Sequence, residues 1–366
     1  MKKKIDSLQA LRALACLVVF ADHSGLNCAV AAAVGVFFML SGFTLSLSSW
    51  EKTEICGFGA GDSLRYAVKK ISKLYILHLI CSLPVLVLDL VTLLGAYSAA
   101  ALTAFVKKII ATVFLIQSWF PNSDIALAFN GVAWYLSTAM FLYFAFPAIL
   151  CGIKKVKSSS SLLFVAVLIY IVQFSLGFVV RPLENILLGH GLIPADGKFA
   201  YWFTYIFPPF RLMDFTVGCC LGAVFVKDEN RASRKKSLGF ELCCILLLVL
   251  SSLIYRRSDS FVTTDAFVYT QLFVPLAAVA VYTFALGRGP VVKLLTNRFT
   301  MFMSKISSDF FLLHQNIIRF TVMFLSYFMA FSTIKKIVPL LCFAMTLVAC
   351  LIWQKLQTMP VFRKKA

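Results

Sequence analysis

Residues 8–25 read LQALRALACLVVFADHSG, and this stretch decides the class of fold. The run is apolar enough to form a membrane-spanning helix, yet Arg12 and His23 lie inside it. An ionisable side chain within a span costs roughly 2.5–3.5 kcal/mol on insertion scales, so such residues usually mark a pathway or a site. We therefore expect a helical membrane protein whose first helix carries part of its functional site.

The composition extends this interpretation to the whole chain. Of its 366 residues, 60% are hydrophobic and 14% are charged, whereas soluble proteins average about 45–50% apolar and about 25% charged residues. No polar block is long enough for a separate soluble domain, so residues 1–366 are expected to form one membrane domain with no appended soluble domain. The formal net charge of +19 comes from short basic clusters between apolar runs, which favours membrane orientation over a nucleic-acid partner.

Apolar runs of the length that a bilayer requires, about 20 residues, predict an all-α fold with about ten transmembrane helices. The stretch 97–129 is also apolar, but Lys107 and Lys108 interrupt it and Pro121 closes it, so it is interpreted as an interfacial or re-entrant segment. The predicted spans are roughly 8–26, 29–49, 74–96, 130–150, 161–180, 209–226, 239–254, 266–286, 306–331 and 337–356.

Lysine and arginine counts predict the orientation of these helices. With the N-terminus inside, the inner segments 1–7, 51–73, 151–160, 227–238, 287–299 and 357–366 together hold 22 basic residues, and the outer segments hold eight. Because cytoplasmic loops carry the excess of basic residues, both termini are expected to be cytoplasmic.

The eleven cysteines lie mostly in apolar runs, and their spacing matches no zinc motif. Buried thiols behave as small hydrophobic side chains. The sequence therefore predicts neither a metal site nor disulfide bonds.

Arg12 and His23 are eleven positions apart. At about 100° and about 1.5 Å per residue, the two side chains lie on one face of a helix, about 16 Å apart along its axis. This geometry suits a long substrate whose anionic part is held at the inner end while its reactive end reaches the outer end. The spacing is equally consistent with a structural pair that neighbouring helices satisfy, with Arg12 extending to the inner surface.

The next apolar run contains GVFFMLSGF at residues 35–43. A small residue such as Gly42 lets two helix backbones approach closely, and Ser41 can donate to a carbonyl one turn back. Taken alone, both residues have structural roles.

Six features in chain order resemble the membrane-bound acyltransferase 3 family. The first two are the pair Arg12 and His23 and the segment GVFFMLSGF. The other four are YAVKKISKLYILHLI (66–80), NGVAWYLSTAMFLYFAFP (130–147), FPPFRLMDFTVGCCLG (207–222) and SKISSDFFLLHQNII (304–318). Each motif is weak alone, but their order over nearly the whole chain makes the combination specific.

The resemblance implies an O-acyltransferase in the inner (plasma) membrane of a bacterium. Such enzymes move an acyl group, usually acetyl, from cytoplasmic acyl-coenzyme A to a hydroxyl of a surface glycan or lipid-linked sugar on the far side. The family's essential arginine and histidine correspond to Arg12 and His23. Many members have a glutamate in the Trp-x-Leu-Ser helix, where this chain has Ala139 and Met140, so no acid role is assigned there.

Within this interpretation His23 is the predicted catalytic group. Imidazole is the side chain that titrates near neutral pH without perturbation, so it can take the proton of an acceptor hydroxyl. Alternatively it carries the acyl group itself. Asp22 lies about 100° away around the helix and is not assigned as its partner.

Arg12 is also placed in the catalytic site, where it is expected to hold a donor phosphate or the pantetheine end. Lys69, Lys70 and Lys73 share one helical face that can bind the phosphates of coenzyme A. Plain positive-inside charge explains these lysines equally well. Ser41, Lys70 and Lys73 are counted among the candidate substrate-binding residues.

Four further candidates for substrate binding also have structural interpretations. Arg211 pairs with Asp214 by default, or it contacts the acceptor. Trp134 and Tyr135 stack on a sugar, or they belong to an interfacial aromatic belt. His314 is either a satisfied core histidine or a second residue of the site.

Two other classes of function compete with an enzyme. Buried charges and a polar path across ten helices would also suit a multi-span transporter of a small anionic or sugar-like solute. The matched broken helices of that class are not found in the sequence. A purely structural subunit would leave the ordered motifs unexplained.

Overall fold

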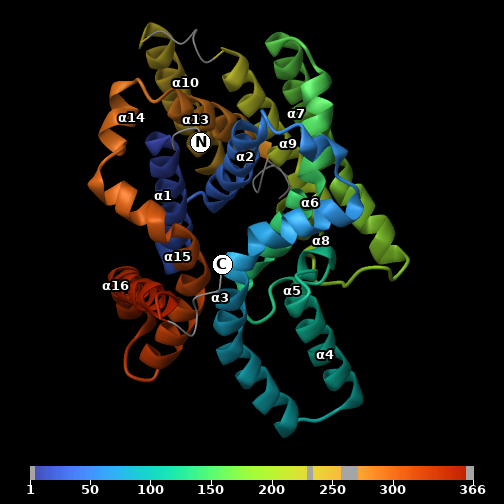
Figure 1. Cartoon of the computed structure of the whole chain (residues 1–366). Helices are drawn as coiled ribbons and strands as arrows, with labels where there is room; N and C mark the ends of the chain where they lie inside the picture. The colour runs from blue at the N-terminus through green and yellow to red at the C-terminus, as the bar shows by residue number, and fades with distance from the viewer. Residues whose placement is uncertain (1–4, 229–233, 257–270, 360–366) are drawn as a thin grey trace.

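In the computed structural model, described for residues 5–228, 234–256 and 271–359, helices pack side by side around a buried apolar core (Figure 1). The described residues contain no β-strand, and the predicted all-α fold is confirmed. The ten helices that correspond to the predicted spans are α1 (Asp6–Ala21), α2 (Val30–Ser49), α3 (Ala60–Gly95), α6 (Trp134–Lys155), α7 (Ser159–Gly189), α9 (Pro208–Asp228), α10 (Arg234–Arg256), α13 (Val274–Leu286), α15 (Arg298–Leu325) and α16 (Phe331–Gln357).

Seven segments within the described residues are long and apolar enough to cross a membrane, which makes the chain a multi-pass membrane protein. They comprise α2, α3, α7, α16, most of α10, and two longer segments that contain α6 and α9. Helices α1 and α13 are shorter, at 16 and 13 residues, and α15 is more polar. The total of ten spans stays a prediction, since the start of the predicted span 266–286 and parts of three predicted inner segments lie outside the described residues.

Helices α2 and α9 pack backbone to backbone at the centre of the bundle. A Cβ atom on Gly42 would overlap the carbonyl oxygen of Phe215, and one on Gly218 would overlap the carbonyl oxygen of Met39. Glycine at these positions removes the side chain that would hold the helices apart. The close approach predicted for Gly42 is confirmed, and Ser41 donates to the carbonyl of Phe37 one turn back at 2.8 Å.

The stretch 97–129 forms a short helical excursion. It contains α4 (Ala99–Val113), a 3₁₀ turn at Gln117–Trp119 and α5 (Ser123–Ala126). Figure 1 shows α4 running back along the outer half of α3, and the two helices extend together beyond the rest of the molecule. At 15 residues, α4 is shorter than the roughly 20 residues that a full span needs, as expected for an interfacial or re-entrant segment.

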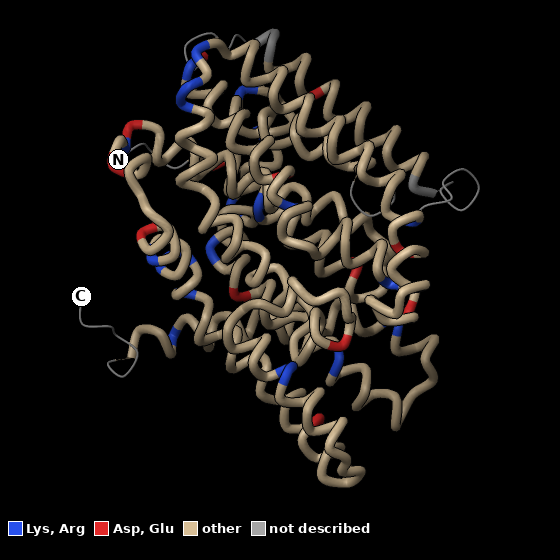
Figure 2. The backbone as a smooth tube through the Cα atoms, turned by 90° about the vertical axis from the view of Figure 1, so that its right-hand side faces the viewer, with Lys and Arg blue, Asp and Glu red and all other residues tan. Residues whose placement is uncertain are grey.

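Basic residues are distributed unevenly along the long axis of the molecule. Figure 2 shows lysine and arginine along the upper and middle parts of the chain trace, while the tip of the α3–α4 hairpin at the bottom is mostly uncharged. The orientation in which that tip faces outward stays a prediction from these same basic residues.

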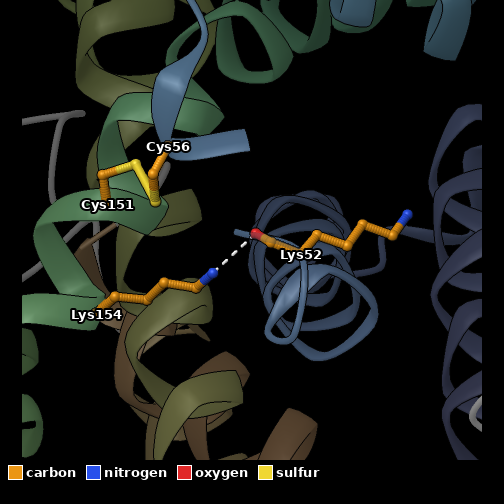
Figure 3. Close-up of a disulfide and its surroundings, with 4 residues drawn as sticks. All are labelled: Lys52, Cys56, Cys151 and Lys154. Carbon is orange, nitrogen blue, oxygen red and sulfur yellow. Dashed lines mark hydrogen bonds between the residues drawn. A yellow bond between two sulfur atoms is a disulfide. The ribbon is translucent and has the colours of Figure 1, made fainter. Parts of the chain in front are cut away.

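The expectation of no disulfide bonds is wrong for one pair. Cys56, between α2 and α3, is bonded to Cys151 near the end of α6 (Figure 3). The fold brings their Cα atoms to 5.3 Å, within the range that a disulfide requires. The sequence does not reveal this pair, because the bond forms only when the segment before α3 meets the end of α6, 95 positions further along the chain.

Candidate active site

A cavity of about 1110 Å³ lies among α1, α2, α3, α6, α15 and α16. Small-molecule pockets usually measure about 300–1,000 Å³, so this one can hold a large ligand. Its lining includes four basic side chains, Arg12, Lys69, Lys70 and Lys73. None of the four forms a salt bridge with a described residue. The charges are therefore available to an anionic ligand.

The spacing of the lysines explains how one helix supplies three of these charges. Lys73 follows Lys70 by three positions and Lys69 by four on α3, so it projects from the next helical turn toward the same side as both. Arg12 reaches the cavity from α1, and the carboxylate of Asp309 joins the lining from α15. The four cations outweigh this one acid, so the lining is positively charged overall.

Three hydroxyl groups lie near Arg12. Ser41 of α2 donates to the carbonyl of Phe37, and Tyr135 and Tyr143 lie two helical turns apart on α6. All four residues line the cavity. Hydroxyl donors beside a guanidinium can bind carbonyl or phosphate oxygens of a ligand.

Three aromatic rings from three helices meet at one wall of the cavity. The ring centroid of Phe311 lies 5.4 Å from that of Tyr135 and 6.0 Å from that of Phe37. Phe37 and Tyr135 are also 6.0 Å apart. We call Phe37, Tyr135 and Phe311 the aromatic cluster. The ring of Phe311 also lies 6.0 Å from that of His314, which places the cluster between the cavity and a second polar site.

That second site is a pair of histidines from opposite ends of the chain. His23 Nδ1 lies 2.8 Å from His314 Nε2, and the two rings are nearly parallel at 11°. His314 is buried within α15, whereas His23 is half-buried. Neither residue lines the cavity. We call these two residues the histidine pair.

The backbone at His23 departs from the predicted regular helix over residues 8–26. Helix α1 ends at Ala21, and Asp22–Leu26 form a wider π turn. Gly25 then adopts a φ of 94° and Asn27 a φ of 47°, values that suit glycine and asparagine better than other residues. The uniform spacing assumed for Arg12 and His23 is therefore wrong at its outer end. Single π turns inside helices are frequent at functional sites.

The predicted site residues thus fall into three groups. Arg12, Ser41, Lys70, Lys73 and Tyr135 line the cavity, and His23 and His314 form the histidine pair. Trp134 and Arg211 are buried outside the cavity lining.

Arg211 forms the ion pair that its spacing allows. Its Nη1 atom donates to Asp214 at 2.7 Å, its Nε atom donates to the carbonyl of Tyr205 at 2.9 Å, and Gln173 donates to Asp214 at 2.9 Å. The guanidinium also lies over the ring of Phe38, against which Trp134 packs. These contacts serve the core, and neither Arg211 nor Trp134 has a role in the mechanism below.

Sequence patterns missed several residues of the site. Phe37 and Tyr143 lie inside quoted motifs and were not singled out, although Tyr143 follows Tyr135 by two helical turns on α6. Asp309 and Phe311 lie in the SKISSDFFLLHQNII segment with His314, and only His314 was proposed for the site. No spacing rule could have joined His23 to His314, because 291 residues separate them.

Comparisons with known proteins identify acyltransferases as relatives of this chain. Residues 5–354 match a family described as an acyltransferase domain. A curated relative, the acyltransferase MdmB of Streptomyces mycarofaciens, is 26% identical over 248 residues, which cover 60% of this chain and 57% of the relative. The match thus spans a little over half the length of that relative. No solved structure matches the chain significantly.

Proposed function

This chain belongs to the membrane acyltransferase 3 family, and on that premise we propose that it transfers an acetyl group from acetyl-coenzyme A to a hydroxyl of a surface or exported glycan. The observation that carries the proposal is the position of a large cationic cavity next to a histidine pair, with the aromatic cluster between them. The family makes the chain a membrane acyltransferase. The donor, the acceptor and a location in the bacterial inner membrane are parts of the proposal.

The cavity suits coenzyme A as the donor. The phosphates of coenzyme A need several cations, and Lys69, Lys70 and Lys73 supply point charges on one helix face. Arg12 supplies a planar fork that can fix two oxygens in one geometry. The cavity lies toward the end of the bundle that the basic residues predict to be cytoplasmic, where acyl-coenzyme A is made.

The histidine pair supplies the chemistry. A hydroxyl of the acceptor gives its proton to His23 as its oxygen attacks the thioester carbonyl. The carbon–sulfur bond then breaks, and the proton passes from His23 to the leaving thiolate. The products are the acyl ester of the acceptor and free coenzyme A. For this geometry the acyl end of the donor must pass the aromatic cluster while Arg12 holds the part that remains in the cavity.

Acyl transfer explains more of the molecule than solute transport does. A transporter would need a path on which a solute meets successive polar groups across the membrane. Here the aromatic cluster closes one wall of the cavity toward the histidine pair. A thin pantetheine arm suits this geometry better than a hydrated sugar or anion.

Reconstitution into liposomes tests the proposal. Acetyl-coenzyme A with a labelled acetyl group is supplied on one face, and a mixture of surface oligosaccharides on the other. We expect an alkali-labile labelled ester on the oligosaccharide, formed only when the donor is on the face to which the cavity opens. Passage of either solute across the membrane without ester formation would contradict acyl transfer and favour a transporter.

A further inference from the structure

The hydrogen bonds of His314 define which of its nitrogens carries a proton. Its Nδ1 atom lies 3.1 Å from the carbonyl oxygen of Phe310, one turn earlier on α15. A carbonyl oxygen only accepts, so His314 Nδ1 must carry the hydrogen. In a neutral imidazole the other nitrogen, here Nε2, then has a free lone pair.

The surroundings of His314 favour the neutral ring. Its side chain is buried, and besides His23 its neighbours within ring-contact distance are Phe20, Phe310 and Phe311. No described carboxylate pairs with it. Placing an unpaired charge in such an apolar environment is costly. His314 Nε2 is therefore an acceptor.

The hydrogen bond between His23 and His314 sets the tautomer of His23. His23 Nδ1 lies 2.8 Å from His314 Nε2, and an acceptor on one side requires a donor on the other. His23 therefore carries its hydrogen on Nδ1 and leaves Nε2 bare. A bare imidazole nitrogen is the form that can take a proton from a hydroxyl.

We propose that His314 is a positioning residue that holds His23 in the Nδ1-protonated tautomer, so that His23 Nε2 is the base of the acyl transfer. The inference rests on the proposed function. The chain of hydrogen bonds runs from the Phe310 carbonyl through His314 to His23, and it parallels the orienting group of a catalytic triad. When His23 takes a proton on Nε2, its Nδ1–H bond to His314 stabilises the positive ring. His314 itself gains and loses no proton.

Packing keeps this arrangement rigid. Phe20 lies near the end of α1, three positions before His23. Its ring centroid is 5.4 Å from that of Phe310 and 5.6 Å from that of Phe343. Phe310 lies nearly parallel to His314. These rings fill the space around His314 and restrict its rotation, which is what a positioning residue requires.

The tautomer of His23 can be measured directly on the resting protein. The chain has four histidines, so ¹⁵N-histidine labelling gives few imidazole signals, and His23→Ala assigns those of His23. We expect a protonated Nδ1 and a bare Nε2 for His23 in the wild type, and loss of this preference in His314→Leu. A protonated Nε2 in the wild type, or an unchanged tautomer in His314→Leu, would overturn the proposal.

Kinetics separate positioning from a structural role. Leucine at 314 cannot accept a hydrogen bond, whereas the amide oxygen of glutamine can replace Nε2. We expect His314→Leu to lower kcat about 10–100-fold, by analogy with the loss when the hydrogen-bond partner of a metal-bound histidine is removed. The KM for the donor should stay unchanged, and His314→Gln should recover much of the loss. Equal losses in both variants, or a rise in KM with kcat unchanged, would contradict the proposal.

His78→Leu is the matched control. His78 is also fully buried, its Nε2 atom bonds the carbonyl of Thr112, and neither residue lines the cavity or belongs to the histidine pair. We expect its removal to leave kcat near the wild-type value. If His23→Ala retained full acyl transfer, the proposed function of His23 would fail. The tautomer measurement would still report whether His314 sets the protonation of His23.

Discussion

The cavity and the histidine pair are neighbours that are built in opposite ways. The cavity has about 1110 Å³ of space and four cations without described carboxylate partners. The pair is one short hydrogen bond between two rings, enclosed by other rings. Charges in an open site attract a ligand while tolerating small displacements, whereas a hydrogen bond in a low-dielectric environment fixes one geometry. The difference indicates that donor binding and chemistry reside in separate places, so mutations should change them separately.

The largest effect is expected at the histidine pair. His23→Ala removes the base, and general-base groups contribute about 10²–10⁴-fold to rate. Acyl transfer by the purified variant should fall by that factor, while the affinity for coenzyme A stays near wild type because His23 does not line the cavity. Near-full transfer by His23→Ala would show that the pair is structural.

A smaller loss is expected for Arg12→Lys, because Arg12 lines the cavity and is proposed to position the donor for reaction. Lysine keeps the charge but loses the planar fork, and a displacement of about 1 Å in a reacting group can cost about a hundredfold in rate. We expect a moderate loss of donor affinity and a disproportionate loss of turnover, compared with an Arg12→Ala control checked for membrane insertion. Unchanged turnover in Arg12→Lys would assign Arg12 to anchoring of α1.

A still smaller effect is expected at the aromatic cluster, which lies between the cavity and the histidine pair. Phe311→Leu should loosen the aromatic cluster and shift the acyl preference toward longer chains, by up to about fourfold per added methylene if each gains about 0.8 kcal/mol of burial. The measurement compares acetyl-, propionyl- and butyryl-coenzyme A as donors. Phe146→Leu, a buried ring on α6 outside the cavity lining, is the control. An unchanged preference in Phe311→Leu would mean that the acyl chain does not pass the cluster.

The smallest effect is expected from Cys56→Ser combined with Cys151→Ser. Disulfides are rare in the cytoplasm, and this pair lies at the end that the basic residues predict to be cytoplasmic. If this end is cytoplasmic, the bond present in the structure should be reduced in cells. A membrane-impermeant alkylating reagent should then label both thiols only after permeabilisation, and the double variant should keep a nearly unchanged activity. Protection from alkylation until a reductant is added would indicate that this end faces an oxidising compartment and would reverse the predicted orientation.

The fold was largely predictable because its signals are local. Apolar runs of span length mark the ten helices, and Gly42 marked a close helix contact that the structure contains. The π turn at His23 was not predictable from periodicity, since the residues before it form a regular helix. The Cys56–Cys151 bond was not predictable either, because it depends on how α6 packs beside the start of α3.

The site was predictable in part for the same reason. Lys69, Lys70 and Lys73 were grouped by helical spacing, and the structure places all three in the cavity lining. Arg211 and Trp134 lie in segments that resemble the family and were proposed beside structural alternatives, and both are buried in the core. The contact between His23 and His314 depends on α1 packing against α15, which no pattern within either helix encodes.

Calorimetric titration of coenzyme A into the detergent-purified protein tests most directly whether binding and chemistry are separate. Exposed ion pairs contribute about 0.2–1 kcal/mol each, so the triple variant Lys69→Gln, Lys70→Gln, Lys73→Gln should bind about tenfold more weakly at low salt. His23→Ala should bind like the wild type, and so should a control with Lys107, Lys335 and Lys336 changed to glutamine, three lysines outside the cavity lining. Equal affinity of the cavity variant and the wild type, or loss of binding in His23→Ala, would contradict a donor site that is separate from the histidine pair.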